Sequence, residues 1–384
     1  MAEKFQKMYL CISKDKEEKS VEMRKILRRL NIFALLYGFV GEVRRALYRC
    51  RLLKSARFDN VAVVSIGNLS MGGTGKTPHT EFLISRLSAK YRTAILSRGY
   101  GRKSRGFVST KELAAKHCSA ETIGDEPLQM HLKFPDLEIT VCEKRKTGIE
   151  KLLQQKEPPE LIILDDAYQH LQVAPDCHIL LTEYARPYST DFVVPAGRLR
   201  EFPSAAKYAD IIIVTKAPAD LTIEERNSFI QKLKPCQGQD VFFSTIEYKA
   251  PKPMTAAAEQ RTLTAETPVK LVTGIANPEP LRKHVCSQFK NVKHFKFGDH
   301  HTFTKKELDE IINYKFDKNS DNPIIITTEK DISRLMSDNT KKIISLQSIF
   351  SFPIEMKILF EEEEKLINKI EKICYKKSKK VQNI

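Results

Sequence analysis

One stretch, from Val61 to Pro78 (VAVVSIGNLSMGGTGKTP), most constrains what this 384-residue chain can fold into. The run from Val61 to Ile66 is apolar and rich in β-branched residues, which predicts a buried strand. A glycine-rich turn follows, and a helical apolar pattern begins after Thr77. Glycines let such a turn wrap closely around phosphate oxygens, so that backbone N–H groups point at the anion. The order of strand, glycine loop, Gly-Lys-Thr and helix therefore predicts a P-loop.

Eight consecutive positions form the predicted nucleotide-binding loop: Ser70, Met71, Gly72, Gly73, Thr74, Gly75, Lys76 and Thr77. Lys76 is expected to reach the β- and γ-phosphates, and the Thr77 hydroxyl is expected to bind Mg²⁺. Ser70 stands where the strict GxxxxGK[ST] pattern has its first glycine. The strand and helix on either side favour a nucleotide site over an ordinary glycine-rich turn.

A second motif supports the first. Leu161 to Leu164 is a continuous apolar run that predicts a buried strand, and it ends in Asp165 and Asp166, about 90 residues after the P-loop. A strand closed by Asp is typical of the Walker B motif, in which carboxylate oxygens hold Mg²⁺ directly or through water. We therefore expect Thr77, Asp165 and Asp166 to form the metal site.

Three other segments carry polar side chains whose role the residues alone leave open: Asp125 and Glu126 in GDEP, Arg200 and Glu201 in PAGRLRE, and His300 and His301 after Asp299. The acidic pair is either functional or simply favoured by the dipole at a helix N-terminus. The Arg-x-Arg-Glu loop is either a surface ion pair or part of a phosphate clamp. The histidine pair suits a general base, a ligand or the protein surface.

The N-terminal part of the chain has two sections. Residues 1–22 are polar and mixed in charge, which predicts a loose extension. Residues 23–58 contain an apolar run of eleven residues, from Leu30 to Val40, with arginines on both sides. This run is too short to cross a bilayer, which takes about 20 residues. It predicts a basic amphipathic helix that lies either in a membrane interface or on the protein core with a solvated basic face.

The rest of the chain divides into two α/β patterns. Residues 59–249 form the predicted P-loop domain, with a mostly parallel sheet. A segment rich in Pro, Ala and Thr follows and resembles a linker. Strand and helix patterns resume at Val269, so residues 250–384 are expected to form a second, smaller C-terminal α/β domain. Its lysine-rich tail is expected to be solvated or to face a membrane.

Composition limits the partners and the compartment. The net charge of +16 and the isoelectric point near 9.3 call for anionic partners: nucleic acid, an acidic membrane surface or a phosphorylated substrate. Eight cysteines without CxxC pairs indicate neither a disulfide framework nor a zinc site, and a reducing cytoplasm is the simpler compartment.

Seven motifs occur in the order seen in one enzyme family: GNLSMGGTGKTP, LSRGYGRKSRGF, GDEP, LDDAYQH, PAGRLRE, DHHTF and TTEKD. From about Met23 to Leu346 the chain resembles tetraacyldisaccharide 4'-kinase, the lipid A 4'-kinase of Gram-negative bacteria. The resemblance implies that ATP donates its γ-phosphate to the 4'-hydroxyl of an acylated glucosamine disaccharide 1-phosphate, giving lipid IVA. It also implies a P-loop α/β domain with a smaller C-terminal α/β domain, and ATP and Mg²⁺ as cofactors.

The resemblance also assigns residues. The segment from Ser70 to Thr77 matches the family's P-loop, which also lacks the first glycine. Asp125 and His300 match its base and orienter for the 4'-hydroxyl, and Arg200 and Glu201 match its active-site Leu-Arg-Glu segment. Where this chain has Ala167 and Tyr168, the family more often has Gly and Phe.

The resemblance further implies a peripheral enzyme on the cytoplasmic face of the inner membrane. We expect a monomer that binds this anionic surface and its acylated disaccharide phosphate substrate, and no nucleic acid. Two other classes remain as alternatives. A P-loop GTPase or metal chaperone would need a guanine-binding NKxD motif, and the nearest segment, TKAP at Thr215, lacks the Asp. A nucleic-acid-binding ATPase would also suit the positive charge.

Overall fold

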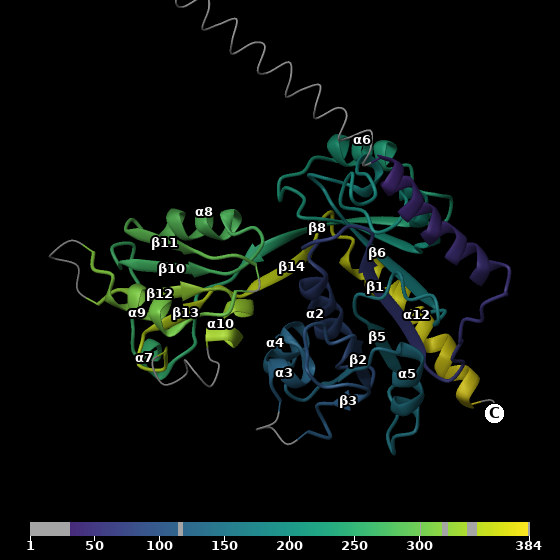
Figure 1. Cartoon of the computed structure of the whole chain (residues 1–384), viewed down its shortest axis with the longest axis horizontal. Coiled ribbons are helices and arrows are strands. Elements are labelled where there is room, and N and C mark those ends of the chain that lie inside the picture. Colours follow the sequence, from purple (N-terminus) through teal and green to yellow (C-terminus); the bar gives the residue numbers. More distant parts are fainter. Residues whose placement is uncertain (1–30, 114–117, 300, 317–321, 336–343, 383–384) are drawn as a thin grey trace, which may run out of the picture.

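The computed structural model describes residues 31–113, 118–299, 301–316, 322–335 and 344–382. These residues form two β-sheets with packed helices, which lie side by side and are joined through the strands β8 and β14 (Figure 1). The α/β class expected from the sequence is therefore confirmed. We call the two parts the P-loop unit and the smaller unit.

Within the described residues, the sheet of the P-loop unit has nine strands in the order β14-β8-β7-β6-β1-β5-β2-β4-β3. In chain order its strands are β1 (Ala62–Asn68), β2 (Thr93–Ser97), β3 (Val108–Ser109), β4 (Glu138–Val141), β5 (Leu161–Leu164), β6 (Cys177–Glu183), β7 (Ile211–Thr215), β8 (Asp240–Tyr248) and β14 (Ile354–Ile358). The strands are parallel except for β3 and β14 at the two edges.

The strand before the P-loop lies in the middle of this sheet. Every residue of β1 is buried, and β1 pairs in parallel with β5 on one side and β6 on the other. Ser65 lies opposite Leu164, so the chain leaves β1 and β5 at the same edge. Parallel strands of an open α/β sheet bind ligands at their carboxyl ends. The two predicted motifs therefore meet because of strand order, although they are far apart in sequence.

Helices cover both faces of the P-loop unit. They are α2 (Lys76–Leu87), α3 (Ala120–Ile123), α4 (Asp125–Lys133), α5 (Arg145–Leu153), α6 (Ile223–Leu233) and α12 (Glu363–Gln382), with 3₁₀ turns η2 (Tyr188–Thr190) and η3 (Pro203–Tyr208). The main core joins Ile66 of β1, Leu83 of α2 and Ile370 of α12. Burying such side chains stabilises the fold by about 1.5–3 kcal/mol each.

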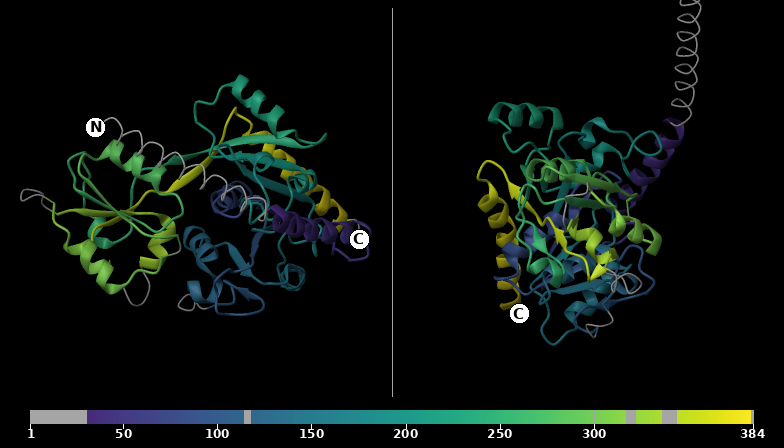
Figure 2. Two further views of the ribbon diagram at one scale, coloured as in Figure 1. Left: turned by 45° about the horizontal axis from the view of Figure 1, so that its top comes forward. Right: turned by 90° about the vertical axis from the view of Figure 1, so that its left-hand side faces the viewer.

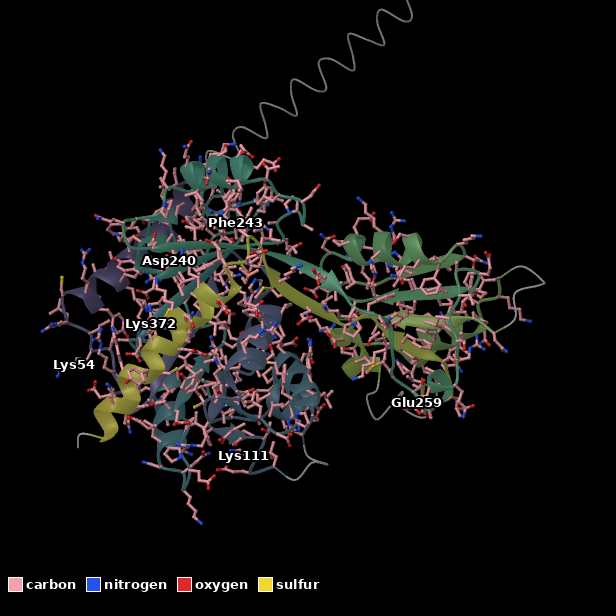
Figure 3. All side chains as sticks on the ribbon, turned by 180° about the vertical axis from the view of Figure 1, so that it is seen from behind. Lys54, Lys111, Asp240, Phe243, Glu259 and Lys372 are labelled. Atoms are coloured by element: carbon pink, nitrogen blue, oxygen red, sulfur yellow. The ribbon has the colours of Figure 1, made fainter. Side chains whose placement is uncertain are left out.

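The C-terminal segment corrects the expected extent of the second domain. Residues from Ile354 onward return to the P-loop unit, where β14 pairs with β8 and α12 packs on β1 and α2. Figure 3 shows α12 crossing the back of this unit, with Lys372 on it. The apolar stripe of α12, with Ile370 and Cys374, is buried against this unit, while Lys372 and Lys376 of the same helix are exposed. Lys369 also binds Asp240 at 2.6 Å.

The smaller unit has a five-stranded sheet in the described residues, in the order β11-β10-β12-β13-β9. Its elements are β9 (Lys252–Pro253), α7 (Ala256–Glu259), β10 (Val269–Thr273), α8 (Glu279–Gln288), β11 (Val292–Lys296), α9 (Lys305–Asn313), β12 (Ile324–Thr327), α10 (Glu329–Leu335) and β13 (Ile349–Ser351). α10 contacts α4 of the P-loop unit, and ion pairs join the two helices: Lys133 with Glu329, and Arg334 with Asp125.

The N-terminal helix covers residues 31–49 and lies along the flank of the P-loop unit (Figure 2). Ala34 is buried on its inner side, and Gly38 faces the ring of Phe202. Its other side exposes large apolar side chains: Ile32, Phe33, Leu35, Leu36, Phe39, Val40 and Val43. Residues 1–30, including the predicted extension, lie outside the described residues. In the part of the chain that the structure describes, no helix is long and apolar enough to cross a membrane.

Candidate functional site

The P-loop connects β1 to α2 in the conformation that its glycines permit. Gly72 and Gly75 have φ angles of +107° and +86°, a left-handed region that side chains other than glycine rarely adopt. A Cβ atom built on Gly72 or Gly73 would meet no atom within 4 Å, so this side of the loop is open. The loop leads directly into the N-terminus of α2 at Lys76, where free backbone N–H groups attract an anion. This geometry fits a bound phosphate chain.

The loop that carries Arg200 is paired with the P-loop along its backbone. The N–H of Met71 donates to the carbonyl oxygen of Arg198 at 2.7 Å, and the N–H of Arg200 donates to that of Leu69 at 2.7 Å. Ser70 and Leu199 lie between them as an isolated β-bridge. The Pro-Ala-Gly-Arg-Leu-Arg-Glu segment is therefore fixed to the P-loop rather than free on the surface.

Opposite charges converge where β1 and β5 end. The Nζ atom of Lys76 lies 3.7 Å from Oδ1 of Asp166, and Nη1 of Arg200 lies 3.4 Å from the same oxygen. Asp166 has a φ angle of +45°, a left-handed conformation that is uncommon outside glycine and clusters at functional sites. The side chains of Lys76, Asp166 and Arg200 thus form one cluster at the carboxyl ends of β1 and β5.

Asp165, the residue before Asp166, is fully buried. Burial, together with the negative charges of Glu126 and Asp166, raises its pKa to about 7. Arg145, also buried, donates to the backbone carbonyl of Asp165 at 3.2 Å. Among the described residues, no group of three or more His, Cys, Asp or Glu side chains could hold a metal ion. A cation here would therefore need phosphate or hydroxyl oxygens as further ligands.

Asp125 is placed by both units. It is the first residue of α4, and its Oδ2 lies 3.0 Å from Nη2 of Arg334 on α10. Arg334 is itself held by Asp331 at 3.1 Å and by the carbonyl oxygen of Gly274 at 3.2 Å. The position of the smaller unit therefore determines the partner of the Asp125 carboxylate. His300, the predicted orienter, lies outside the described residues.

Glu201 is bound on both carboxylate oxygens. Nε and Nη2 of Arg45 lie 3.1 Å and 2.6 Å from its two oxygens, and both residues are buried. The guanidinium of Arg45 also lies over the rings of Tyr168 and Tyr208. A carboxylate held on both oxygens is fixed in position and suited to positioning neighbouring groups.

One cavity of about 1090 Å³ joins most of these side chains. Its lining includes Gly72, Gly73, Lys76, Asp125, Asp166, Arg200 and Glu201 among the predicted residues, and Tyr37, Val40, Arg44, Arg98, Arg145 and His170 besides. Asp299 and Lys330 of the smaller unit also reach it. The cavity thus extends from the P-loop to the apolar N-terminal helix, and it is lined by several arginines.

His170 lines this cavity and carries a buried polar atom, Nε2, without a hydrogen-bond partner among the described residues. Burial lowers its pKa to about 4, and the nearby cations Arg145, Arg44 and Arg98 act in the same direction. The ring is therefore neutral at physiological pH.

Three arginines that hold acidic residues of this site in place were not identified from the sequence. Arg45 was one of several arginines after an apolar run, and nothing local marks it as the partner of Glu201. Arg145 lies between Lys144 and Lys146 in the sequence, and this basic run was a usable but weak signal. Arg334 follows the TTEKD motif by a few residues and carries no local sign of its contact with Asp125.

Comparisons with known proteins agree with this geometry. The family model described as Tetraacyldisaccharide-1-P 4'-kinase matches residues 26–375. A tetraacyldisaccharide 4'-kinase of Bacteroides thetaiotaomicron is 40% identical over 353 residues, covering 89% of this chain and 91% of that protein. One of Flavobacterium psychrophilum is 42% identical over 350 residues, covering 90% and 96%.

A solved structure supports the same relationship. LpxK from Aquifex aeolicus, in complex with ATP, matches with a TM-score of 0.68 and 28% sequence identity. The match covers 91% of this chain and 100% of that one. The P-loop, the acidic pair and the paired Arg200 loop thus occur in a chain that these relatives match over nearly its whole length. The chain belongs to the tetraacyldisaccharide-1-P 4'-kinase family.

Proposed function

We propose that this protein transfers the γ-phosphate of ATP to the 4'-hydroxyl of tetraacyldisaccharide 1-phosphate, giving lipid IVA in lipid A biosynthesis. The observation that carries the proposal is the single cavity on which Lys76, Asp125, Asp166 and Arg200 meet. It has room for a sugar head group beside the P-loop, and family membership specifies the acceptor.

ATP is the donor in this proposal. The open side at Gly72 and Gly73, with the N-terminus of α2 behind it, would receive the triphosphate. Lys76 would then contact the β- and γ-phosphates, where charge changes during transfer. Arg200, held by its backbone pairing with the P-loop, would neutralise the same region.

The acidic pair supports Mg²⁺ as the second cofactor. Burial raises the pKa of Asp165, the charges of Glu126 and Asp166 add to the shift, and a divalent cation would offset this repulsion. Thr77, Asp165 and Asp166 would hold the ion together with phosphate oxygens. The bound metal would supply charge neutralisation on the phosphates during transfer.

Asp125 would accept the proton of the acceptor hydroxyl. As the 4'-oxygen forms its bond to the γ-phosphorus, the bond from that phosphorus to the β–γ bridging oxygen breaks, and ADP leaves. The hydroxyl proton passes to the Asp125 carboxylate, with His300 as the proposed orienter. Arg334 would hold the Asp125 side chain in place, because it contacts this carboxylate from the smaller unit. Glu201 is proposed here as a positioning residue.

The N-terminal helix supports a peripheral position on the membrane. Its exposed apolar side chains suit the interface of a bilayer, and Tyr37 and Val40 of the same helix line the cavity. An acylated acceptor could therefore keep its chains in the bilayer while its sugar enters the site. We propose that the protein acts as a monomer at the anionic cytoplasmic face of the inner membrane and does not require nucleic acid.

Transfer of radiolabel from γ-labelled ATP to purified tetraacyldisaccharide 1-phosphate tests the proposal. We expect a labelled lipid product, formed only when both ATP and the lipid acceptor are present. ADP formation that is independent of the lipid, or stimulated by nucleic acid instead, would contradict it. Mass spectrometry of the product should show the added phosphate on the sugar distal to the existing 1-phosphate.

A further inference from the structure

Three carbonyl oxygens of the P-loop are each held by a side chain: Gly72 by Asn68, Gly73 by Lys216 and Gly75 by His79. A loop that turns N–H groups toward an anion turns the carbonyl groups of the same peptides the other way. Asn68 and His79 belong to β1 and α2, which the loop itself joins. Lys216 instead comes from the end of β7, far along the chain, and its Nζ lies 2.6 Å from the Gly73 oxygen.

The backbone of Lys216 is unusual. Its φ angle is +56°, a left-handed conformation that costs a residue with a side chain about 1–2 kcal/mol. The turn is held by the N–H of Ala217, which donates to the carbonyl oxygen of Ser244 on β8 at 3.0 Å. Strained backbone of this kind persists where the surroundings enforce it and clusters at functional sites. At this position it carries the lysine side chain over the P-loop.

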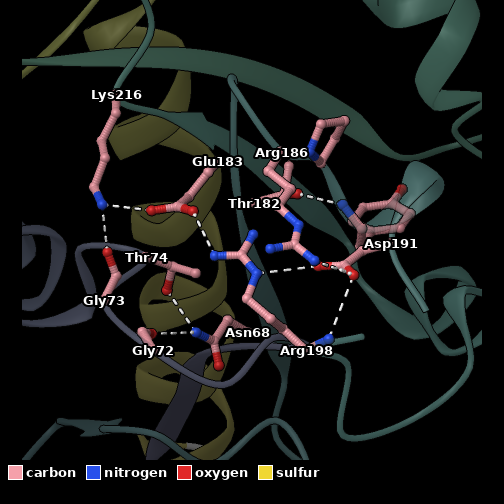
Figure 4. A network of polar contacts seen from close by, with 12 residues as sticks. Asn68, Gly72, Gly73, Thr74, Thr182, Glu183, Arg186, Asp191, Arg198 and Lys216 are labelled. Carbon is pink, nitrogen blue, oxygen red and sulfur yellow. Dashed lines mark hydrogen bonds and ion pairs between the residues drawn. The ribbon is translucent and has the colours of Figure 1, made fainter. Parts of the chain in front are cut away.

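A chain of charges then fixes the Lys216 ammonium. It contacts Glu183 at the end of β6, which lies opposite Thr215 in the sheet. Nη1 of Arg198 lies 3.2 Å from the other oxygen of Glu183, and Nε of Arg198 lies 3.1 Å from Asp191 (Figure 4). Asp191 is buried and Glu183 and Arg198 are partly buried, so the network is anchored in the protein at one end. At its other end it reaches a P-loop carbonyl.

We propose that Lys216 is a positioning residue for ATP, and that Glu183 and Arg198 aim it. By binding the Gly73 oxygen, the ammonium restrains the peptide plane at the centre of the P-loop before the nucleotide arrives. Preorganised backbone dipoles bind an anion better than mobile ones, because no reorganisation is needed at binding. The role is indirect, since Lys216 acts on ATP through the backbone of Gly73.

The location of these residues makes the effect specific to one substrate. Gly73 lines the cavity of about 1090 Å³ described above, whereas Lys216 and Glu183 are not among the residues that line it. Loss of the Lys216 ammonium should therefore weaken ATP binding and leave the lipid acceptor unaffected. This inference rests on the proposed kinase reaction for its kinetic part, but ATP binding can be measured without any acceptor.

The test compares Lys216→Met, which keeps the length and removes the charge, with Lys216→Arg and a matched control, Lys90→Met. Lys90 forms a surface ion pair with Glu371 at 2.5 Å, away from the P-loop. We expect Lys216→Met to raise both the Kd and the KM for ATP about 10-fold, since one restraint of a preorganised anion site is lost. The KM for the lipid should stay within twofold of the wild type, and Lys216→Arg should recover part of the loss.

The proposal is overturned if Lys216→Met binds ATP within twofold of the wild type, or if Lys90→Met weakens ATP binding equally. If Lys216→Met does not fold, Glu183→Gln takes its place, because it removes the negative charge that holds the ammonium and leaves the lysine in place. That variant should raise the Kd for ATP by a smaller factor, and an unchanged Kd would equally reject the proposal. Failure of the wild type to phosphorylate the lipid would reject the proposed function, while the ATP Kd values would still decide the role of Lys216.

Discussion

Arg45 of the N-terminal helix and Glu201 of the loop beside the P-loop form a buried, bidentate ion pair, with distances of 3.1 Å and 2.6 Å. The residue before Glu201 is Arg200, which contacts Asp166 at the predicted metal site. The helix that exposes apolar side chains is therefore joined to the charge cluster by two consecutive residues of one loop. A shift of the helix would therefore also displace Arg200.

We expect Arg45→Gln to lower kcat by about 10-fold or more, because Glu201 then loses its partner and Arg200 its fixed position. Removing one member of a buried ion pair also destabilises a protein by roughly 3–5 kcal/mol. The double variant Arg45→Met with Glu201→Leu should regain much of this stability but little of the activity. Urea unfolding and steady-state kinetics on both variants separate the two effects.

The control for this pair is Arg49→Gln, an exposed residue of the same helix. It should retain both activity and stability, and all variants should still bind vesicles that contain anionic lipid. Full kcat in the double variant would show that the pair only stabilises the fold.

Lys76→Ala should lower kcat by on the order of 10²-fold or more, because it removes a positive charge from the phosphoryl group in transfer. The folded structure should survive, since among the described residues the ion pair of the Lys76 side chain is a long one, 3.7 Å to Asp166. Single-turnover kinetics at saturating ATP would measure the effect on the chemical step. Near-normal turnover would argue against the P-loop assignment.

Asp165→Asn and Asp166→Asn test the metal site. Each amide keeps the shape of the carboxylate and loses its charge, so Mg²⁺ should bind more weakly in both variants. Activity titrated against Mg²⁺ should show a raised half-saturation concentration, or no rescue at any concentration. Variants that follow the wild-type curve would mean that the acidic pair is only a structural turn.

Asp125 and His300 are proposed to act as one proton-transfer unit. Removing either should lower kcat far more than it changes the KM for ATP. The double variant Asp125→Ala with His300→Ala should be little worse than the poorer single variant, because members of one unit fail together. A double-mutant cycle in which the two losses multiply would reject a shared role.

His178 gives the protein a predictable dependence on pH. Burial lowers its pKa from 6.5 to about 4, so the folded protein keeps this ring neutral. The unfolded chain binds a proton at this ring as the pH falls below 6.5, whereas the folded protein does so only near pH 4. The free energy of unfolding therefore decreases as the pH falls from about 6.5 to about 4. Asp165 acts in the opposite sense, because burial raises its pKa to about 7.

Comparing the wild type with His178→Gln isolates the contribution of His178 to the pH dependence of stability from that of groups such as Asp165. The free energy of unfolding of the wild type, relative to this variant, should fall by on the order of 2 kcal/mol between pH 7 and pH 5. Urea unfolding at both pH values measures this difference. A difference that does not change with pH would mean that His178 is accessible to protons in the folded state.

The local parts of this protein were predictable from its sequence. The strand, glycine turn and helix around Lys76, and the apolar strand before Asp165, follow from neighbouring residues in the chain. Periodicity and turn chemistry act over a few residues, so these elements appear in the structure near the predicted bounds. The meeting of the two motifs was expected as well, because parallel strands share one edge.

Only the tertiary structure decided which distant groups become partners. No pattern near Arg45, Arg334 or Lys216 indicates its contact with Glu201, Asp125 or Gly73, because each pair is joined by strand order and helix packing. The return of α12 to the P-loop unit was missed for the same reason: an amphipathic helix shows in sequence that it needs an apolar surface, but not which one. The sequence by itself determined the chemistry of the site, and the packing of distant segments determined how that chemistry is held in place.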